Sequence, residues 1–135
     1  MPPAEPMWPY PEKYLEGVRL FNEEDFFESH DVLEELWSET HGPERKFYQG
    51  LIQISISLFH FGNDNFGGAR KLYESSRKYL EDYRPQYMAL DVERLLGDHQ
   101  TCFAELLACS DPFNTPEVGL KDELVPKMVF ENEAG

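Results

Sequence analysis

The amino-acid sequence predicts an all-α protein, a single helical bundle in which one central buried helix, residues 44–62, is surrounded by the others. Three observations predict this fold. Apolar residues recur at helical spacing along most of the chain, and hydrophobic residues make up 41% of it. Residues 44–62 are apolar on most sides, which is typical of an enclosed helix. The length of 135 residues suits one domain and is too short for two well-packed enzyme domains.

Three segments are expected along the chain. Residues 1–11 form a proline-rich N-terminal arm, residues 12–110 the helical-bundle domain, and residues 111–135 a loosely structured C-terminal tail. The five prolines of the arm remove backbone donors and restrict their neighbours, so the arm should be extended. Its aromatic residues, Trp8 and Tyr10, are expected to contact the body of the protein.

The first three helices are predicted from apolar spacing and from residues that begin or end helices. The first is expected over residues 12–22. Asp25 is a favourable N-cap for the second, with Glu28 three residues later as its capping-box partner, and this helix should end near Thr40. The third, residues 44–62, begins after a Gly-Pro pair.

The second half of the chain adds two more helices and an internal echo. Asn65 should cap a fourth helix that ends before Arg84, a fifth is expected over residues 91–108, and one helical turn is expected near Lys121. Six positions are followed, forty residues later, by identical or similar residues. Phe21, Asp25, Phe26, Val32, Leu33 and Glu34 correspond to Phe61, Asn65, Phe66, Leu72, Tyr73 and Glu74. This echo predicts two helical hairpins of related shape within a closed bundle.

Composition and charge exclude several classes of partner. Twelve Lys and Arg stand against 26 Asp and Glu, a net charge of -14, which argues against nucleic acid and anionic membranes. The chain has neither a membrane-length apolar window nor the features of a signal peptide, so a cytoplasmic location is expected. Cys102 and Cys109 should lie about 10 Å apart on one helix, beyond disulfide reach.

Three segments of the chain resemble a known family. They are FFESHDVLEELW (residues 26–37), GPERKFYQGLIQ (42–53) and GNDNFGGARKLYESSRKYLEDYRP (62–85). They resemble domain-of-unknown-function family 309, a group of uncharacterised bacterial-type proteins, and the resemblance spans residues 14–95. It implies a helical bundle with one central helix and implies no activity.

Polar residues on the second and third helices form the first candidate site. His30 and Glu34 are four residues apart on an otherwise apolar stripe, and the third helix carries its own polar stripe. The candidate polar pocket comprises His30, Glu34, Trp37, Gln49, Gln53 and His60. Burying the amides and imidazoles unpaired would cost about 1 to 3 kcal/mol each, so His30, Glu34, Gln53 and His60 are expected to converge. A ligand pocket and an internal hydrogen-bond network that fixes helix register both fit this pattern.

A more specific form of the ligand-pocket hypothesis is a metal site. His30, Glu34 and His60 could supply three ligands and leave an open position for water. The diagnostic patterns H-E-x-x-H and Glu-x-x-His are absent from the sequence, so no metal is expected and any cofactor is left unidentified.

The fourth helix offers a candidate anion site. Gly67 and Gly68 lie in its first turn, followed by Arg70 and Arg77. The competing interpretation is that these arginines either form ion pairs with the acidic second helix, at Glu28, Glu34 or Glu35, or are exposed to solvent.

Two histidines fall outside these candidates. His99 shares an apolar stripe and is expected to be a satisfied core histidine, whereas His41 beside a Gly-Pro turn should be exposed.

The function predicted from the sequence is a non-catalytic binding or adaptor module. The alternative is a small, metal-assisted hydrolytic enzyme that uses His30, Glu34 and His60. Motifs of serine hydrolases, P-loop proteins and dinucleotide-binding proteins are absent from the sequence. The partner, whether a protein or a small ligand, is not identified by the sequence, and a homo-oligomer is left open.

Overall fold

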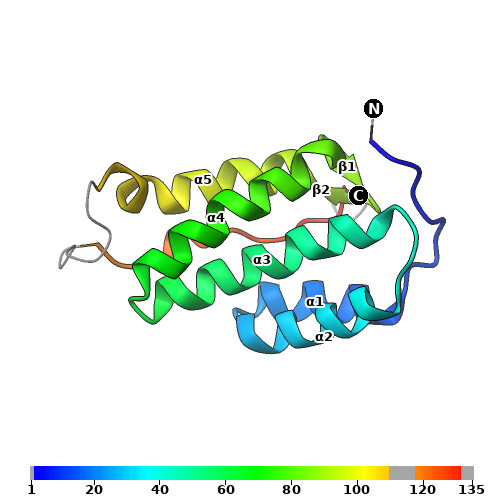
Figure 1. Ribbon diagram of the computed structural model, residues 1–135, viewed down its shortest axis with the longest axis horizontal. Coiled ribbons are helices and arrows are strands. Elements are labelled where there is room, and N and C mark those ends of the chain that lie inside the picture. Colours follow the sequence, from blue (N-terminus) through cyan, green and yellow to red (C-terminus); the bar gives the residue numbers. More distant parts are fainter. Residues whose placement is uncertain (1, 110–117, 132–135) are drawn as a thin grey trace.

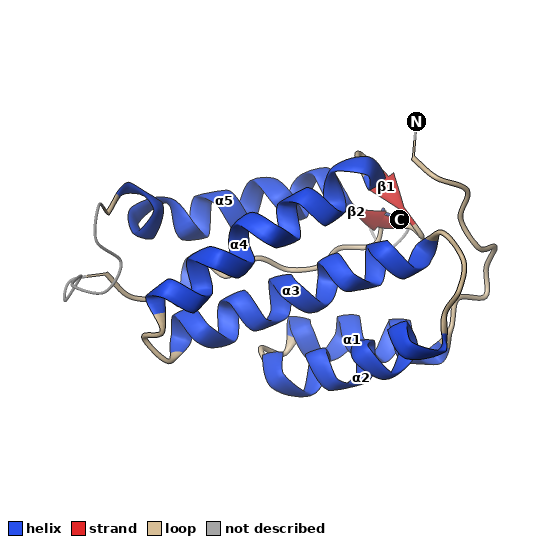
Figure 2. Cartoon of the chain, in the orientation of Figure 1, coloured by secondary structure: helices blue, strands red, loops and turns tan. Residues whose placement is uncertain are grey.

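The computed structural model describes residues 2–109 and 118–131. Within this part of the chain the fold is predominantly α-helical (Figures 1 and 2). Its helices are α1 (Glu12–Asn22), α2 (Phe26–Glu39), α3 (Glu44–Gly62), α4 (Phe66–Leu80) and α5 (Val92–Ala108), with short 3-10 turns η1 (Glu81–Tyr83) and η2 (Asp122–Leu124). The all-α bundle predicted from the sequence is confirmed.

Helix α3 is the centre of the bundle. It lies between α1 and α2 on one side and α4 and α5 on the other (Figure 1). Leu51, Ile54 and Leu58 are completely buried, and the other buried apolar side chains of α3 belong to the same hydrophobic core. A helix that is apolar on most sides is stable only when neighbours cover it, and the prediction of a central helix over residues 44–62 is confirmed.

The α1–α2 and α3–α4 junctions have the same geometry, as the internal echo predicts. Glu24 (φ 64°) and Asp64 (φ 60°) both adopt the left-handed conformation that ends a helix. The next N–H donates back across the turn in each case, from Asp25 to the Leu20 carbonyl at 2.9 Å and from Asn65 to the His60 carbonyl at 2.8 Å. The chain therefore contains two helical hairpins with related turns.

The N-caps of α2 and α4 differ in their side-chain bonds. Asn65 Oδ1 accepts a hydrogen bond from the Gly68 N–H at 3.1 Å, which confirms the predicted cap of α4. Asp25 stands at the N-cap position of α2, but its side chain makes no capping hydrogen bond. The capping box predicted for Asp25 and Glu28 is therefore wrong, because the backbone turn places the residue without engaging its carboxylate.

Two glycines let helices approach closely inside the hairpins. A Cβ added at Gly17 would lie 2.5 Å from Leu33 Cδ2, and one at Gly50 would lie 2.6 Å from Leu80 Cδ2. Since Leu33 and Leu80 are fully buried, neither can move aside cheaply. The helix spacing in both hairpins thus depends on glycine.

A short β-hairpin between η1 and α5 departs from the sequence prediction, which contains no strand. Strands β1 (Gln86–Tyr87) and β2 (Leu90–Asp91) pair antiparallel around a turn in which Met88 and Ala89 have φ values of 47° and 63°. Strands of two residues carry no period-two pattern, and the turn lacks the Asn or Gly that normally announces such a conformation.

The C-terminal segment also differs from the loosely structured tail expected of it. Residues 118–131 run the length of the bundle back to the hairpin, and Val125 and Met128 are buried (Figure 1). Phe130 forms an isolated β-bridge with Leu90, which joins the C-terminal segment to the two-stranded hairpin. The predicted turn near Lys121 is present as η2. Residues 110–117 and 132–135 lie outside the described part, and the domain boundaries stay a prediction.

The N-terminal arm is attached at the same end of the bundle as the hairpin (Figure 1). The Tyr87 hydroxyl donates to the Ala4 carbonyl at 2.6 Å, and the Met88 N–H donates to Glu5 Oε1 at 3.2 Å. Cys102 and Cys109 are both free, as expected from their spacing. Among the helices described, none combines the length and apolar character required to cross a bilayer.

Candidate functional site

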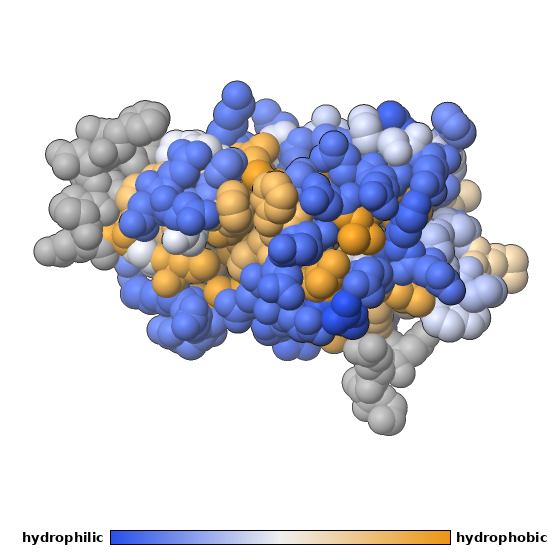
Figure 3. Space-filling view, turned by 90° about the horizontal axis from the view of Figure 1, so that it is seen from below, coloured by the Kyte–Doolittle hydropathy of each residue, from blue (hydrophilic) through white to orange (hydrophobic). Residues whose placement is uncertain are grey.

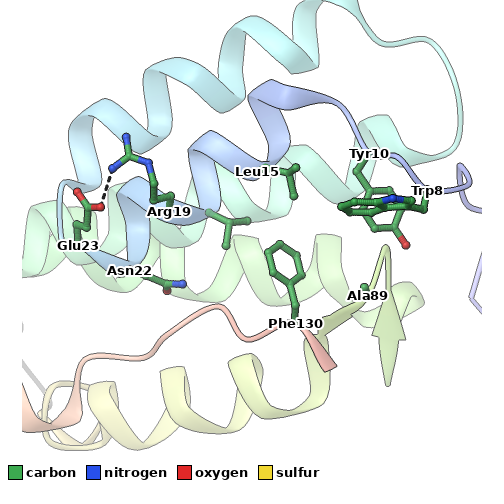
Figure 4. A pocket seen from close by; sticks show the side chains of 9 residues that line it. Trp8, Tyr10, Leu15, Arg19, Asn22, Glu23, Ala89 and Phe130 are labelled. Carbon is green, nitrogen blue, oxygen red and sulfur yellow. Dashed lines mark hydrogen bonds and ion pairs between the residues drawn. The ribbon is translucent and has the colours of Figure 1, made fainter. Parts of the chain in front are cut away.

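A cleft of about 630 Å³ opens where the N-terminal arm, α1, the hairpin turn and the C-terminal segment meet. Its size is within the range of small-molecule sites, which are typically about 300 to 1,000 Å³. Figure 4 shows it from close by. The lining residues are Trp8, Tyr10, Leu15, Val18, Arg19, Asn22, Glu23, Ala89 and Phe130.

Helix α1 supplies one wall. Leu15, Val18 and Asn22 are separated by three and four residues, so they lie on one face of the helix. Val18 is almost fully buried, while Leu15 is half-buried against the core. An amphipathic helix normally buries such a face against its neighbour, and here part of that face borders the cleft instead.

The arm closes one end of the cleft with aromatic rings. Trp8 and Tyr10 contact each other edge to face at 5.3 Å, and Tyr10 contacts the buried Tyr14 in the same manner at 5.8 Å. Trp8 nevertheless remains 68% exposed. Burial, followed by the nearby Glu5 carboxylate, raises the pKa of Tyr10, so its hydroxyl stays protonated at neutral pH.

The C-terminal segment and the hairpin turn form the opposite wall. The Glu131 N–H donates to the Ala89 carbonyl at 2.8 Å, and the Asp91 N–H donates to the Val129 carbonyl at 2.9 Å. These bonds fix Phe130, whose side chain projects toward α1 and contacts the Tyr14 ring at 5.9 Å (Figure 4).

The far end of the cleft is polar. Arg19 forms ion pairs with Glu16 at 2.5 Å and with Glu23 at 2.6 Å, and the hydrogen bonds that its guanidinium donates to both carboxylates raise its pKa above the usual value. Asn22 hydrogen-bonds both backbone groups of Met128: Nδ2 donates to the carbonyl at 2.9 Å and Oδ1 accepts from the N–H at 2.7 Å. The cleft therefore runs from aromatic rings through aliphatic side chains to a polar end (Figure 4).

The polar residues singled out from the sequence lie elsewhere. His30 Nε2 is 2.9 Å from Glu34 Oε2, so this pair forms as its spacing predicts. His60 Nδ1 instead lies 3.3 Å from Asn65 Nδ2, and Gln53 Oε1 has no partner among the described residues. No hydrogen bond or ion pair within residues 2–109 and 118–131 joins the His30–Glu34 pair to Gln53 or His60.

The other two members of the predicted pocket line a second cleft. Trp37 and Gln49 border a more open hollow of about 510 Å³, where the Arg45 guanidinium lies 3.9 Å from the centre of the Trp37 ring. The structure thus brings Trp37 and Gln49 together and separates them from the histidines. One enclosed pocket containing all six residues is not formed.

The proposed metal ligands do not assemble either. Nowhere in the described part of the chain do three or more His, Cys, Asp or Glu side chains gather in a way that could hold a metal ion. His30 and Glu34 provide two neighbouring groups, and His60 does not complete them into a site of three ligands.

Gly68, Arg70 and Arg77 of the candidate anion site on α4 already donate hydrogen bonds within the protein. The Gly68 N–H is used by Asn65. Arg70 donates to the Cys109 carbonyl at 3.1 Å, where it caps the C-terminal end of α5, and Arg77 donates to the Leu96 carbonyl at 2.7 Å. Gly67 lies half-buried beside them.

The ion pairs between α4 and α2, one of the two alternatives to the anion site, are not formed. Arg70 pairs with Glu74 on its own helix at 3.7 Å, and neither Arg70 nor Arg77 reaches Glu28, Glu34 or Glu35. The physical reason is the central helix, since α3 lies between α2 and α4 (Figure 1).

His99 is the core histidine that the sequence predicts, and His41 is exposed as expected. The His99 ring is completely buried, and Nε2 lies 3.0 Å from Ser57 Oγ. Ser57 Oγ in turn donates to the Ile54 carbonyl at 2.7 Å, so Nε2 must carry the proton. Nδ1 has no hydrogen-bond partner among the described residues, so only one of the two ring nitrogens is hydrogen-bonded, whereas the sequence predicted a fully hydrogen-bonded histidine. Burial, with a smaller contribution from Arg77, lowers the pKa of His99 to about 3.

Sequence reasoning did not find the cleft as a site. It predicted the contact of Trp8 and Tyr10 with the body, but it treated α1 as ordinary core and the C-terminal residues as a loose tail. The available signals were the two aromatic residues in a proline-rich arm and the apolar stretch around Phe130. Neither signal indicates that these segments meet at one end of α1.

Comparisons with known proteins place the chain in a family without assigning an activity. It is 31% identical over 118 residues to the uncharacterized protein YpuF of Bacillus subtilis, covering 84% of this chain and 67% of that protein. It is 25% identical over 104 residues to an uncharacterized protein of Aquifex aeolicus, covering 76% of this chain and 30% of that protein. The family described as Domain of unknown function (DUF309) matches residues 14–72. The chain belongs to the DUF309 family.

Proposed function

We propose that this protein is a non-catalytic binding module whose cleft holds a small, elongated, largely apolar ligand. The observation that carries the proposal is the cleft of about 630 Å³ between the arm, α1 and the C-terminal segment. Sites for small molecules are concave and mainly apolar, with a few polar groups that fix orientation, and this cleft has that character.

The lining also indicates what kind of ligand would fit. Trp8 and Tyr10 offer flat apolar contacts at one end, and Leu15 and Phe130 continue the apolar surface (Figure 4). At the polar end two carboxylates, Glu16 and Glu23, flank a single guanidinium, so the local net charge is negative. A neutral or cationic polar group on the ligand is therefore favoured over a carboxylate or phosphate.

The chemistry of the lining supports binding rather than catalysis. The ionisable side chains of the cleft are Tyr10, Arg19 and Glu23, and the last two are paired with each other. A nucleophile or general base needs a partner that activates it, and none of these three groups has that arrangement. The alternative of a metal-assisted hydrolase built on His30, Glu34 and His60 receives no support, because those side chains do not converge.

Backbone strain beside the cleft gives further support. Ala89 holds a left-handed φ of 63°, a conformation that costs a residue with a side chain roughly 1 to 2 kcal/mol. Tertiary contacts hold the turn in place, since the Tyr14 hydroxyl donates to the Met88 carbonyl at 3.1 Å. Strain of this kind is concentrated at functional sites, where the shape of the chain matters more than its stability.

The test is a fluorescence titration with N-phenyl-1-naphthylamine, an uncharged apolar dye. We expect saturable binding, and we expect decan-1-ol and decylamine to displace the dye better than decanoate. Leu15→Gln should weaken dye binding about tenfold, because a buried leucine contact is worth about 1.5 to 3 kcal/mol.

Leu107→Gln is the matched control, since Leu107 is also a half-buried helical leucine that packs against the core but lies outside the cleft. It should leave dye binding unchanged. Absence of saturable binding, or equal weakening by both substitutions, would contradict the proposal.

A further inference from the structure

An exposed aromatic ring marks a second surface, away from the cleft. Phe27, near the start of α2, is 46% exposed. Its ring lies 5.3 Å from Phe59 on α3 and 5.3 Å from His30, and Phe59 contacts His60 at 6.0 Å. Phe27, His30, Phe59 and His60 are called the Phe27 patch below. Two hydrogen-bonding imidazoles thus flank an apolar centre formed by α2 and α3.

Carboxylates border this patch along α2. Glu28, Asp31 and Glu34 are all exposed. Among the ion pairs of the described residues, Asp31 and Glu34 contact only His30, at 3.5 Å and 2.9 Å. The acids further along α2, Glu35 and Glu39, instead share the single ammonium of Lys13.

No Lys or Arg occurs in residues 21–41, and among the described residues no Lys or Arg forms an ion pair with Glu28, Asp31 or Glu34, so the acids beside the Phe27 patch lack a permanently cationic partner. The face that contains α1 and α2 is largely hydrophilic, with apolar residues showing through it (Figure 3). An exposed apolar patch bordered by polar residues is typical of an interaction surface, and uncompensated charge of one sign favours a partner of the opposite charge.

We propose that the Phe27 patch docks a basic amphipathic segment of a partner protein. Apolar side chains of that segment would cover Phe27 and Phe59, while its Lys or Arg residues would pair with Glu28, Asp31 and Glu34. Charge complementarity selects this occupant. A second copy of the chain carries the same net charge of -14, and nucleic acid and anionic lipid surfaces are also negative, so all three are repelled.

The probe is a fluorescently labelled amphipathic peptide of about 14 residues, roughly four helical turns, with leucines on one face and lysines on the other. Binding to the full chain is measured by anisotropy. We expect saturable binding that the peptide with glutamates in place of lysines does not show. Phe27→Ser should weaken binding about tenfold, whereas Trp8→Ser, at another exposed aromatic residue, should not.

A pair of double variants separates a specific site from general attraction to an acidic protein. Glu28→Gln with Asp31→Asn removes two charges at the patch, and Asp122→Asn with Glu123→Gln removes two exposed charges of η2. Only the first pair should weaken peptide binding, and dye binding in the cleft should be unchanged in both double variants and in Phe27→Ser, none of which alters a residue that lines the cleft. Equal weakening by the two double variants, insensitivity to Phe27→Ser, or a dimer in sedimentation that Phe27→Ser abolishes would overturn the proposal.

Discussion

Lowering the pH below neutrality should destabilise the bundle through one residue, His99. Its ring is completely buried and its pKa is lowered to about 3, mainly by burial and then by Arg77. In the unfolded chain the imidazole recovers its ordinary pKa of about 6.5. At pH values between about 3 and 6.5 the unfolded state therefore binds one more proton than the native state, and the free energy of unfolding decreases as the pH falls through this range.

The magnitude follows from the two pKa values. The loss is about 1.4 kcal/mol per pH unit once the pH is well below 6.5, which amounts to about 2 kcal/mol between pH 7 and pH 5. Above pH 7 the contribution is complete and constant. A loss of about 2 kcal/mol is large against a typical total stability of about 5 to 15 kcal/mol.

The assay is urea unfolding of the wild type and His99→Gln at pH 7 and pH 5. Glutamine can still donate a hydrogen bond to Ser57 but does not titrate, so the contributions of carboxylates and of the other histidines cancel in the comparison. The wild type should lose about 2 kcal/mol more than the variant between the two pH values. His99→Phe, which keeps a ring in contact with Tyr73 and Phe103, should behave like His99→Gln. Equal losses in wild type and variants would refute the reasoning.

Three further predictions concern packing and the attachment of the C-terminal segment. Gly17→Ala places a Cβ 2.5 Å from a buried leucine and should lower the free energy of unfolding by about 1 to 3 kcal/mol. Gly97→Ala, whose added Cβ would meet no atom within 4 Å, should raise the free energy of unfolding by about 0.5 to 1 kcal/mol. Urea unfolding measures both changes. Asn22→Ala removes both hydrogen bonds to Met128 and should lower that free energy by about 1 to 3 kcal/mol while hydrogen exchange increases in residues 125–131; unchanged exchange would count against this attachment. Ala89→Gly relieves a positive φ and should raise the midpoint of thermal unfolding, and a lower midpoint would contradict the assignment of strain.

The helices could be predicted because their signals are local. Asn65 accepts the bond that an N-cap residue accepts, and the recurrence of Phe21 and Asp25 at Phe61 and Asn65 corresponds to two matching turns. The central position of α3 also follows from its own composition, since a helix that is apolar on most sides must be largely covered by its neighbours.

Features that depend on distant partners could not be predicted in this way. Phe130 pairs with Leu90 forty residues earlier, and Met128 is held by Asn22, more than a hundred residues away in sequence. No local pattern encodes such pairings, so the tail looked unstructured and the cleft that it completes was not foreseen.

The candidate site residues illustrate the same limit. His30 and Glu34 are neighbours because one helix turn fixes their spacing, and the structure contains that pair. Convergence with His60 required α2 and α3 to face each other along their polar stripes. Those stripes instead lie beside aromatic rings, where Phe27 and Phe59 occupy the contact between the two helices. Helix periodicity gives the face of each helix but not the rotation of one helix against the next.

The most direct test of the account is to locate an apolar ligand on the protein by NMR, using backbone amide shifts recorded during a titration with decan-1-ol. The cleft predicts saturable shifts that concentrate in α1 around Leu15, in the turn at Ala89 and at Phe130, three segments that meet only there. The amides of α4 around Ser75, outside the cleft lining, should not shift. Shifts confined to other surfaces, or none at concentrations that displace the dye, would contradict the assignment of this cleft as the binding site.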